Sequence, residues 1–156
     1  MKILPVIICG GAGTRLFPEN KDKLPKQFID LGNWTMFQKS LERVNSALYL
    51  PPIISTNIKY LSLVKKYLKK YKIKKYIIVL EPYKKNTAPA ILAASLLKNI
   101  KSSQPIIFLP SDQLIEDKFK FNAVVKKNAK QIKYKDIFIF GVNISSSDLA
   151  SFMTAS

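Results

Sequence analysis

The chain has 156 residues, of which 47% are hydrophobic, so it can build the core of one domain and is not expected to be intrinsically disordered. Its 26 basic and 10 acidic residues give a formal net charge of +16, and the absence of histidine excludes an imidazole base and a histidine-ligated metal. One cysteine excludes an intrachain disulfide, and no apolar run reaches the roughly 18–20 residues that cross a bilayer.

Strand-like and helix-like segments alternate along the chain. Residues 3–9 form a nearly continuous apolar run, which is typical of a strand covered on both faces. Thr35 is a candidate N-cap for the helix that follows, and Pro89 suits the first turn of a later helix. The predicted strands cover residues 3–9, 53–56, 76–80, 106–109 and 137–142, and the predicted helices cover residues 37–48, 60–71, 87–100 and 119–132.

This alternation predicts an α/β fold with a Rossmann-like, mostly parallel, doubly wound sheet that stops after about five strands. We expect one structured unit over residues 1–144 and a Ser-rich tail without periodicity over residues 145–156. A sheet cut short leaves an edge and an apolar face, so we expect marginal stability or association. Residues 3–9 end in Gly-Gly rather than at a small-residue cleavage site, which predicts a cytoplasmic protein without membrane contact.

The first predicted strand opens into a glycine-rich turn, Gly10-Gly11-Ala12-Gly13-Thr14-Arg15. Glycines let the backbone approach a ligand closely, and amides at the start of a helix attract anions, although many such turns only close a loop. No Gly-Lys-Ser/Thr follows, and Arg15 replaces the third glycine of a dinucleotide fingerprint. Arg15 and Lys26 can clamp a triphosphate from two sides, or Lys26 is one of many solvated lysines.

Two further polar clusters directly follow predicted strands. In the first, which starts at Glu81, Asn86 and Thr87 can hydrogen-bond the edge of a base or can simply cap a helix. In the second, Asp112 is either a magnesium ligand or a loop carboxylate that caps the next turn. Because the carboxyl ends of parallel strands share one edge of a sheet, we expect the three clusters to converge there.

Four motifs occur in one order, at residues 10–16, 25–28, 81–90 and 109–112. Together they resemble the amino-terminal part of bacterial mannose-1-phosphate guanylyltransferase, and the resemblance extends over residues 2–144. The family joins GTP and mannose 1-phosphate into GDP-mannose and pyrophosphate, with magnesium. The resemblance therefore implies a nucleotide-binding part of a sugar-phosphate nucleotidyltransferase.

The resemblance also implies a role for individual residues, and the chemistry is consistent with it, since phosphoryl transfer needs positioning and positive charge rather than a histidine base. The implied triphosphate-binding residues are Gly10, Gly11, Gly13 and Thr14, the implied catalytic cations are Arg15 and Lys26, the implied nucleoside-binding residues are Glu81, Asn86, Thr87 and Ala88, and the implied magnesium ligand is Asp112.

The chain also departs from the family pattern. The family commonly has Ser-Arg at residues 20–21, Arg at Lys85 and His at Gln113, and lysine lacks the bidentate geometry of arginine. After Ile144 the family continues into a Pro-Glu-Thr-Gly-Tyr-Gly-Tyr segment, which this chain lacks together with the sugar-binding half. We therefore expect weak or no activity from the chain alone. One alternative is that the chain is a truncated, non-catalytic fragment. Self-association, or completion of the site by a second chain, is also open.

A basic module that binds nucleotides or nucleic acid is the other alternative. Residues 59–75 interleave lysines with tyrosines, a pattern that can grip a single strand by stacking. However, 24 of the 26 basic residues are lysine, and the 19 Ile and 9 Asn that accompany them indicate a drift toward A/T-rich codons. An amphipathic helix with a solvated lysine face explains the same residues and is the favoured interpretation.

Overall fold

The computed structural model describes residues 1–11, 24–81, 87–98, 100–133 and 136–141. These residues contain the strands β1 (Leu4–Ile8), β2 (Ile53–Asn57), β3 (Ile77–Glu81) and β4 (Ile106–Pro110) and the helices α1 (Met36–Arg43), α2 (Leu61–Lys70), α3 (Thr87–Ser95) and α4 (Lys118–Ala129). Two short 3-10 helices, η1 (Lys26–Phe28) and η2 (Ile58–Tyr60), precede α1 and α2. The predicted alternation of strands and helices is confirmed.

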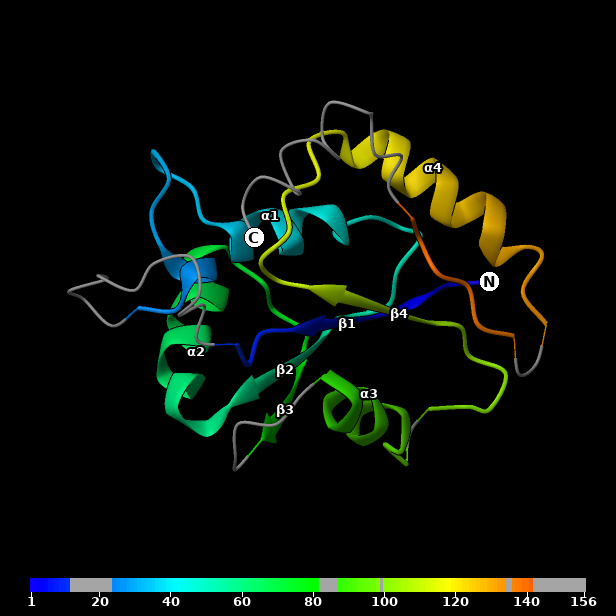
Figure 1. Ribbon diagram of the computed structural model, residues 1–156, viewed down its shortest axis with the longest axis horizontal. Helices are drawn as coiled ribbons and strands as arrows, with labels where there is room; N and C mark the ends of the chain where they lie inside the picture. Colours follow the sequence, from blue (N-terminus) through cyan, green and yellow to red (C-terminus); the bar gives the residue numbers. More distant parts are fainter. Residues whose placement is uncertain (12–23, 82–86, 99, 134–135, 142–156) are drawn as a thin grey trace, which may run out of the picture.

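The four strands form one parallel sheet in the order β3-β2-β1-β4 (Figure 1). From β1 the chain first moves outward through β2 to β3, and the crossover through α3 then returns it to β4 on the other side of β1. The strand order therefore reverses between β1 and β4. The predicted α/β class with a parallel, doubly wound sheet is confirmed.

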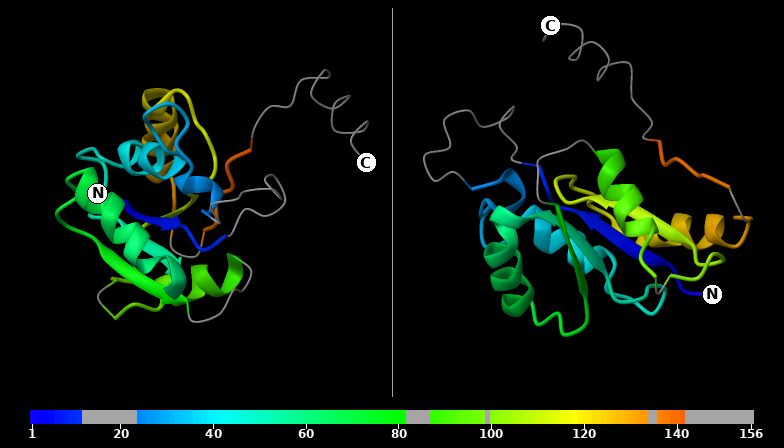
Figure 2. Two further views of the ribbon diagram at one scale, coloured as in Figure 1. Left: turned by 90° about the vertical axis from the view of Figure 1, so that its left-hand side faces the viewer. Right: turned by 90° about the horizontal axis from the view of Figure 1, so that it is seen from below.

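Alternate residues of β1 face two separate apolar layers, as the two-residue repeat of a strand requires. Ile7, with Ile3 and Cys9 at its flanks, packs in the larger layer with residues of α1, α2 and α4. Leu4 and Val6 pack in the smaller layer with Ala94 of α3. Figures 1 and 2 show α3 on one face of the sheet, opposite α1 and α4. Both faces of β1 are buried, which explains its unbroken apolar sequence.

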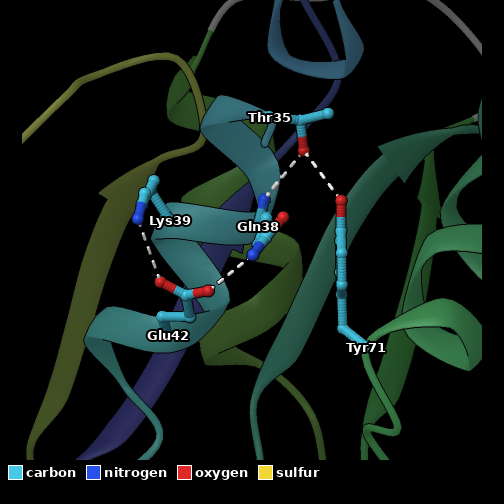
Figure 3. Close-up of polar contacts among 5 residues, drawn as sticks. All are labelled: Thr35, Gln38, Lys39, Glu42 and Tyr71. Atoms are coloured by element: carbon cyan, nitrogen blue, oxygen red, sulfur yellow. Dashed lines mark hydrogen bonds and ion pairs between the residues drawn. The ribbon is translucent and has the colours of Figure 1, made fainter. Parts of the chain in front are cut away.

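The predicted N-cap of α1 is confirmed, because the Thr35 Oγ1 accepts a hydrogen bond from the Gln38 backbone N at 3.1 Å. Figure 3 shows that the same oxygen also meets the Tyr71 hydroxyl, at 3.3 Å, so the cap joins the start of α1 to the end of α2. The helix ends at Arg43 rather than at residue 48. Asn45 and Ser46 follow, and side chains of these types compete with the helix for backbone hydrogen bonds.

Two tyrosines of the basic segment 59–75, Tyr67 and Tyr71, are partly buried and pack against the core. The Tyr67 ring stacks on Phe28 with a centroid distance of 5.2 Å, and its hydroxyl donates to the Phe28 carbonyl at 3.0 Å. Tyr71 lies next to Tyr67, with 5.7 Å between centroids. The lysines at 65, 66, 69 and 70 are exposed. This arrangement is an amphipathic helix with a solvated lysine face, as favoured above.

The predicted strand at residues 137–142 is wrong for its described part, since residues 137–141 form no strand. Their exposure still alternates as in a strand: Ile137 and Ile139 are 88% and 90% exposed, whereas Phe138 and Phe140 are 43% and 45% exposed. Phe140 packs near Phe121 of α4, with 6.1 Å between the ring centroids. A strand also needs backbone hydrogen bonds to a neighbouring strand. Among the described strands β4 pairs with β1 alone, so residues 137–141 do not extend the sheet beside β4.

Apolar side chains are also exposed on α3, which covers the face of the sheet opposite α4. Leu92 of α3 and Leu96, which follows it, are 59% and 71% exposed. The association that we expected from uncovered apolar surface stays a prediction. Among the described residues, no helix combines the length and the apolar composition that a bilayer crossing requires. The proposed Ser-rich tail, residues 145–156, lies outside the described residues.

Candidate functional site

The candidate site lies where β1 and β4 end side by side, at the reversal of the strand order. Cys9, Gly10 and Gly11 leave β1 there, while Ser111 and Asp112 leave β4. The Ser111 amide donates to the Ile8 carbonyl at 3.0 Å and continues the β1–β4 ladder beyond Pro110. In open parallel sheets, ligands bind outside the carboxyl ends of the strands at such a reversal. The first and third predicted clusters therefore meet as expected.

Gln27 holds the start of the glycine-rich turn, at Cys9 and Gly11. The residue is buried, and its Nε2 donates to the Gly11 carbonyl at 3.2 Å and lies 3.4 Å from the Cys9 carbonyl. The Cys9 carbonyl also accepts a hydrogen bond from Thr56 Oγ1 at 3.2 Å. Because the C=O and N–H of one peptide unit point in opposite directions, the Gly10 N–H points away from Gln27. This role of Gln27 was not predicted from the sequence, in which only its position between Lys26 and Phe28 points to the site.

Lys26 and Asp112 form an ion pair across this edge, with 2.5 Å between the Lys26 Nζ and the Asp112 Oδ2. Their side chains are 20% and 33% exposed, so a ligand can reach both. The structure thus joins the predicted catalytic cation to the predicted metal carboxylate. In the free protein each neutralises the other, and a ligand that carries both phosphate and a divalent cation offers each group a new partner.

Glu81 connects the end of β3 to the glycine-rich turn. Ser55 of β2 donates to one of its carboxylate oxygens at 2.7 Å. The carboxylate lies so close to Gly10 that a Cβ there would be 3.3 Å from the other oxygen. Glycine at position 10 therefore leaves room for the carboxylate, which a Cβ there would crowd. The second predicted cluster thus contributes one of its residues to the same edge.

The other predicted site residues divide into two groups. Thr87 and Ala88 are the first two residues of α3, and both are exposed. Gly13, Thr14, Arg15 and Asn86 lie outside the described residues. The group that the structure brings to one edge therefore consists of Gly10, Gly11, Lys26, Glu81 and Asp112.

Cys9 is inert in this setting. It is completely buried, and this burial raises the pKa of its thiol to about 12, although hydrogen bonds with Ser111, Gln27 and Thr56 act in the opposite direction. The thiol therefore stays protonated near neutral pH, and a protonated thiol is neither a nucleophile nor a metal ligand. Its part in the site is structural, because its carbonyl holds the start of the turn.

Asp112 is the predicted ligand for a divalent cation at this edge. The described residues contain no group of three or more His, Cys, Asp or Glu side chains that could enclose a metal ion. Magnesium usually binds one or two carboxylates together with substrate phosphates and water rather than a complete protein cage. The partly exposed Asp112 carboxylate therefore fits a magnesium ion that arrives with a nucleotide.

Comparisons with known proteins agree with this geometry. The model of the family described as nucleotidyl transferase matches residues 4–148. The xanthan biosynthesis protein XanB from Xanthomonas campestris is 34% identical over 142 residues, which are 90% of this chain and 30% of XanB. The mannose-1-phosphate guanylyltransferase from Salmonella montevideo is 33% identical over 141 residues, with the same two shares. The chain thus spans about 30% of the length of these relatives.

Solved structures support the fold. The mannose-6-phosphate isomerase from Helicobacter pylori is 28% identical with a TM-score of 0.63, and the match covers 81% of this chain and 45% of that structure. The inositol-1-phosphate CTP transferase from T. maritima has a TM-score of 0.58 at 18% identity, over 71% of this chain and 44% of that structure, which shows the fold alone. The predicted resemblance to mannose-1-phosphate guanylyltransferases is confirmed. From the family match, which takes in all four strands and the residues gathered at their ends, we conclude that this chain belongs to the nucleotidyl transferase family.

Proposed function

We propose that this chain binds GTP with magnesium at the ends of β1 and β4, as the nucleotide-binding part of a mannose-1-phosphate guanylyltransferase. The observation that carries the proposal is the Lys26–Asp112 pair beside the glycine-rich turn, at the reversal of the strand order. A cation and a carboxylate in one place suit a ligand that carries phosphate and a divalent metal together. The guanylyltransferase among the matched relatives supports guanine and mannose 1-phosphate as the specific substrates.

In the proposed reaction, a phosphate oxygen of mannose 1-phosphate bonds to the α-phosphorus of GTP. The bond from that phosphorus to the bridging oxygen of the β-phosphate breaks, and pyrophosphate leaves with the electron pair. Gly10, Gly11, Gly13 and Thr14 hold the triphosphate, and Arg15 with Lys26 offsets its charge. Such chemistry depends on positioning and electrostatic stabilisation more than on a protein base.

Lys26 changes partners when the nucleotide binds. In the free protein its ammonium group neutralises Asp112, at 2.5 Å. A triphosphate carries more negative charge than one carboxylate, so Lys26 turns to the phosphates and frees Asp112 to hold magnesium. Magnesium, when bound, supplies positive charge next to the phosphates. Because of this exchange, neither the Lys26 ammonium nor the Asp112 carboxylate is left without a charged partner when nucleotide binding excludes water from the site.

The first experiment measures nucleotide binding by wild-type protein, using calorimetric titration with GTP, ATP, CTP and UTP in the presence of magnesium. We expect GTP to bind about tenfold more tightly than the others, because a pair of well-placed hydrogen bonds discriminates between bases by about 1–3 kcal/mol. Equal binding of all four, together with salt-sensitive binding of a random oligonucleotide, would instead support the basic-module alternative. Turnover with mannose 1-phosphate is a separate measurement, in which formation of GDP-mannose tests the complete reaction.

Glu81 is the proposed acceptor for the guanine base. Guanine presents two adjacent N–H donors, N1–H and the 2-amino group, and a carboxylate can accept both. We expect Glu81→Gln to weaken GTP binding by about tenfold or more, because the amide turns one acceptor into a donor. ATP, CTP and UTP binding should change little.

Ser55→Ala is the matched control for this prediction, since it keeps the carboxylate and removes only the hydrogen bond at 2.7 Å that orients it. We expect a loss of about threefold to tenfold for GTP. If Glu81→Gln weakens the binding of all four nucleotides equally, Glu81 does not recognise the base.

A further inference from the structure

Three consecutive residues after β4 are attached to three different elements. The Ser111 amide donates to the Ile8 carbonyl of β1 at 3.0 Å. Asp112 pairs with Lys26 of η1, and the Gln113 carbonyl accepts a hydrogen bond from the Arg43 Nη2 of α1 at 2.8 Å. The backbone is therefore held on both sides of Asp112.

Arg43 occupies an unusual position for a charged residue. It is 1% exposed, and its guanidinium lies over the Phe121 ring of α4, with 5.6 Å from Cζ to the centroid. Among the described residues, the Nε and Nη1 atoms have no hydrogen-bond partner. The guanidinium donates through Nη2, to the Gln113 carbonyl. A buried charge with unused donors is costly, and an apolar side chain of similar volume would pack at lower cost. Packing alone therefore does not explain an arginine here.

The main chain of Arg43 is itself held in place. Asn122 of α4 donates from Nδ2 to the Arg43 carbonyl at 3.1 Å. The Tyr49 hydroxyl donates to the Asn122 Oδ1 at 2.6 Å. A continuous series of hydrogen bonds thus runs from Tyr49 through Asn122 and Arg43 to the Gln113 carbonyl, and it gives the guanidinium a fixed base from which to hold the loop.

We propose that Arg43 is a positioning residue for Asp112: by holding the Gln113 carbonyl, it sets where the Asp112 carboxylate stands relative to Lys26 and the glycine-rich turn. The consequence for metal binding rests on the proposed function of Asp112. Groups that orient a metal-binding residue typically change metal affinity by about 10–100-fold when they are removed. Arg43 acts through the loop and touches no substrate.

The first test is amide hydrogen exchange in the free 156-residue chain, with the Ser111 amide as reporter. We expect Arg43→Met to speed exchange at Ser111 by about tenfold, because it removes a charge-assisted hydrogen bond to the next-but-one residue. Val125→Ala, a buried substitution in α4, is the control for general destabilisation. Unchanged exchange at Ser111, or equal acceleration throughout α1 and α4, would overturn the proposal.

The second test compares GTP affinity with and without magnesium. Arg43→Met should weaken the magnesium-dependent affinity by about 10–100-fold and change the metal-free affinity by no more than about twofold. Arg43→Lys keeps one hydrogen-bond donor, so it should show smaller changes than Arg43→Met in both the exchange rate at Ser111 and the magnesium-dependent affinity. If Arg43→Met does not fold, Arg43→Lys is used in both tests instead. Equal loss with and without magnesium would show a structural role only.

The two proposals can fail separately. If wild-type protein shows no magnesium-dependent GTP binding, the metal role of Asp112 is wrong, and exchange at Ser111 still decides whether Arg43 holds the loop. If wild-type binding depends on magnesium but both Arg43 variants bind as wild type does, the positioning role is wrong and the proposed function stands.

Discussion

Asp112→Asn is expected to weaken the magnesium-dependent binding of GTP by about 100-fold, because the loss of a metal-binding carboxylate costs several kcal/mol and about 1.4 kcal/mol corresponds to tenfold. The same variant should bind GTP about threefold more tightly without magnesium. The reason is that Lys26, which pairs with Asp112 at 2.5 Å in the free protein, becomes available to the phosphates. Calorimetric titration with magnesium and with a chelator measures both effects.

Glu42→Gln is the matched control for this prediction. It changes the charge in the same way and disturbs a pair with Lys39 of 3.4 Å whose side chains are 40% and 39% exposed, outside the site (Figure 3). GTP binding should stay within about twofold of wild type in both conditions, because exposed pairs contribute little. An Asp112→Asn variant that binds GTP more weakly without magnesium would contradict the exchange of partners at Lys26.

Phe28→Ala is expected to lower the free energy of unfolding by about 3–5 kcal/mol, the usual cost of emptying a buried aromatic position. Phe28 is 1% exposed and its ring lies 5.2 Å from both Phe37 and Tyr67. It ends the 3-10 helix that carries Lys26 and Gln27, so it ties the candidate site to α1 and α2. Urea unfolding followed by circular dichroism measures the change.

Phe119→Ala provides the comparison, since Phe119 is 78% exposed and its ring contacts a lysine of its own helix at 5.3 Å. We expect a change within about 0.5 kcal/mol for this variant. A loss below about 1 kcal/mol for Phe28→Ala would mean that the aromatic cluster does not anchor the 3-10 helix.

The positions of the site residues were predictable where local patterns carry the information. Gly10 directly follows one apolar run, and Asp112 comes two residues after another. Parallel strands bring their carboxyl ends to one edge, so the convergence of these residues followed from the alternation of strands and helices. The N-cap at Thr35 was predictable for the same reason, because a cap acts within one turn.

Other features depended on contacts between distant parts of the chain. The segment at 137–141 keeps the alternating exposure of a strand, but whether a strand forms depends on a neighbour that its own residues do not encode. The buried Gln27 and Arg43 have ordinary polar sequences around them, and only the packed structure shows that one holds the glycine-rich turn and the other holds the Gln113 carbonyl.

Composition and the order of apolar runs determined the α/β class and the polar clusters at the strand ends, because side-chain periodicity reflects burial locally. The tertiary structure alone decided that β4 lies beside β1, that Lys26 pairs with Asp112, and that Glu81 reaches Gly10. These contacts depend on how the crossover connections order the strands in the sheet. The net charge of +16 is carried largely by lysines such as those exposed on α2, whereas the proposed site uses Lys26, which the fold pairs with Asp112.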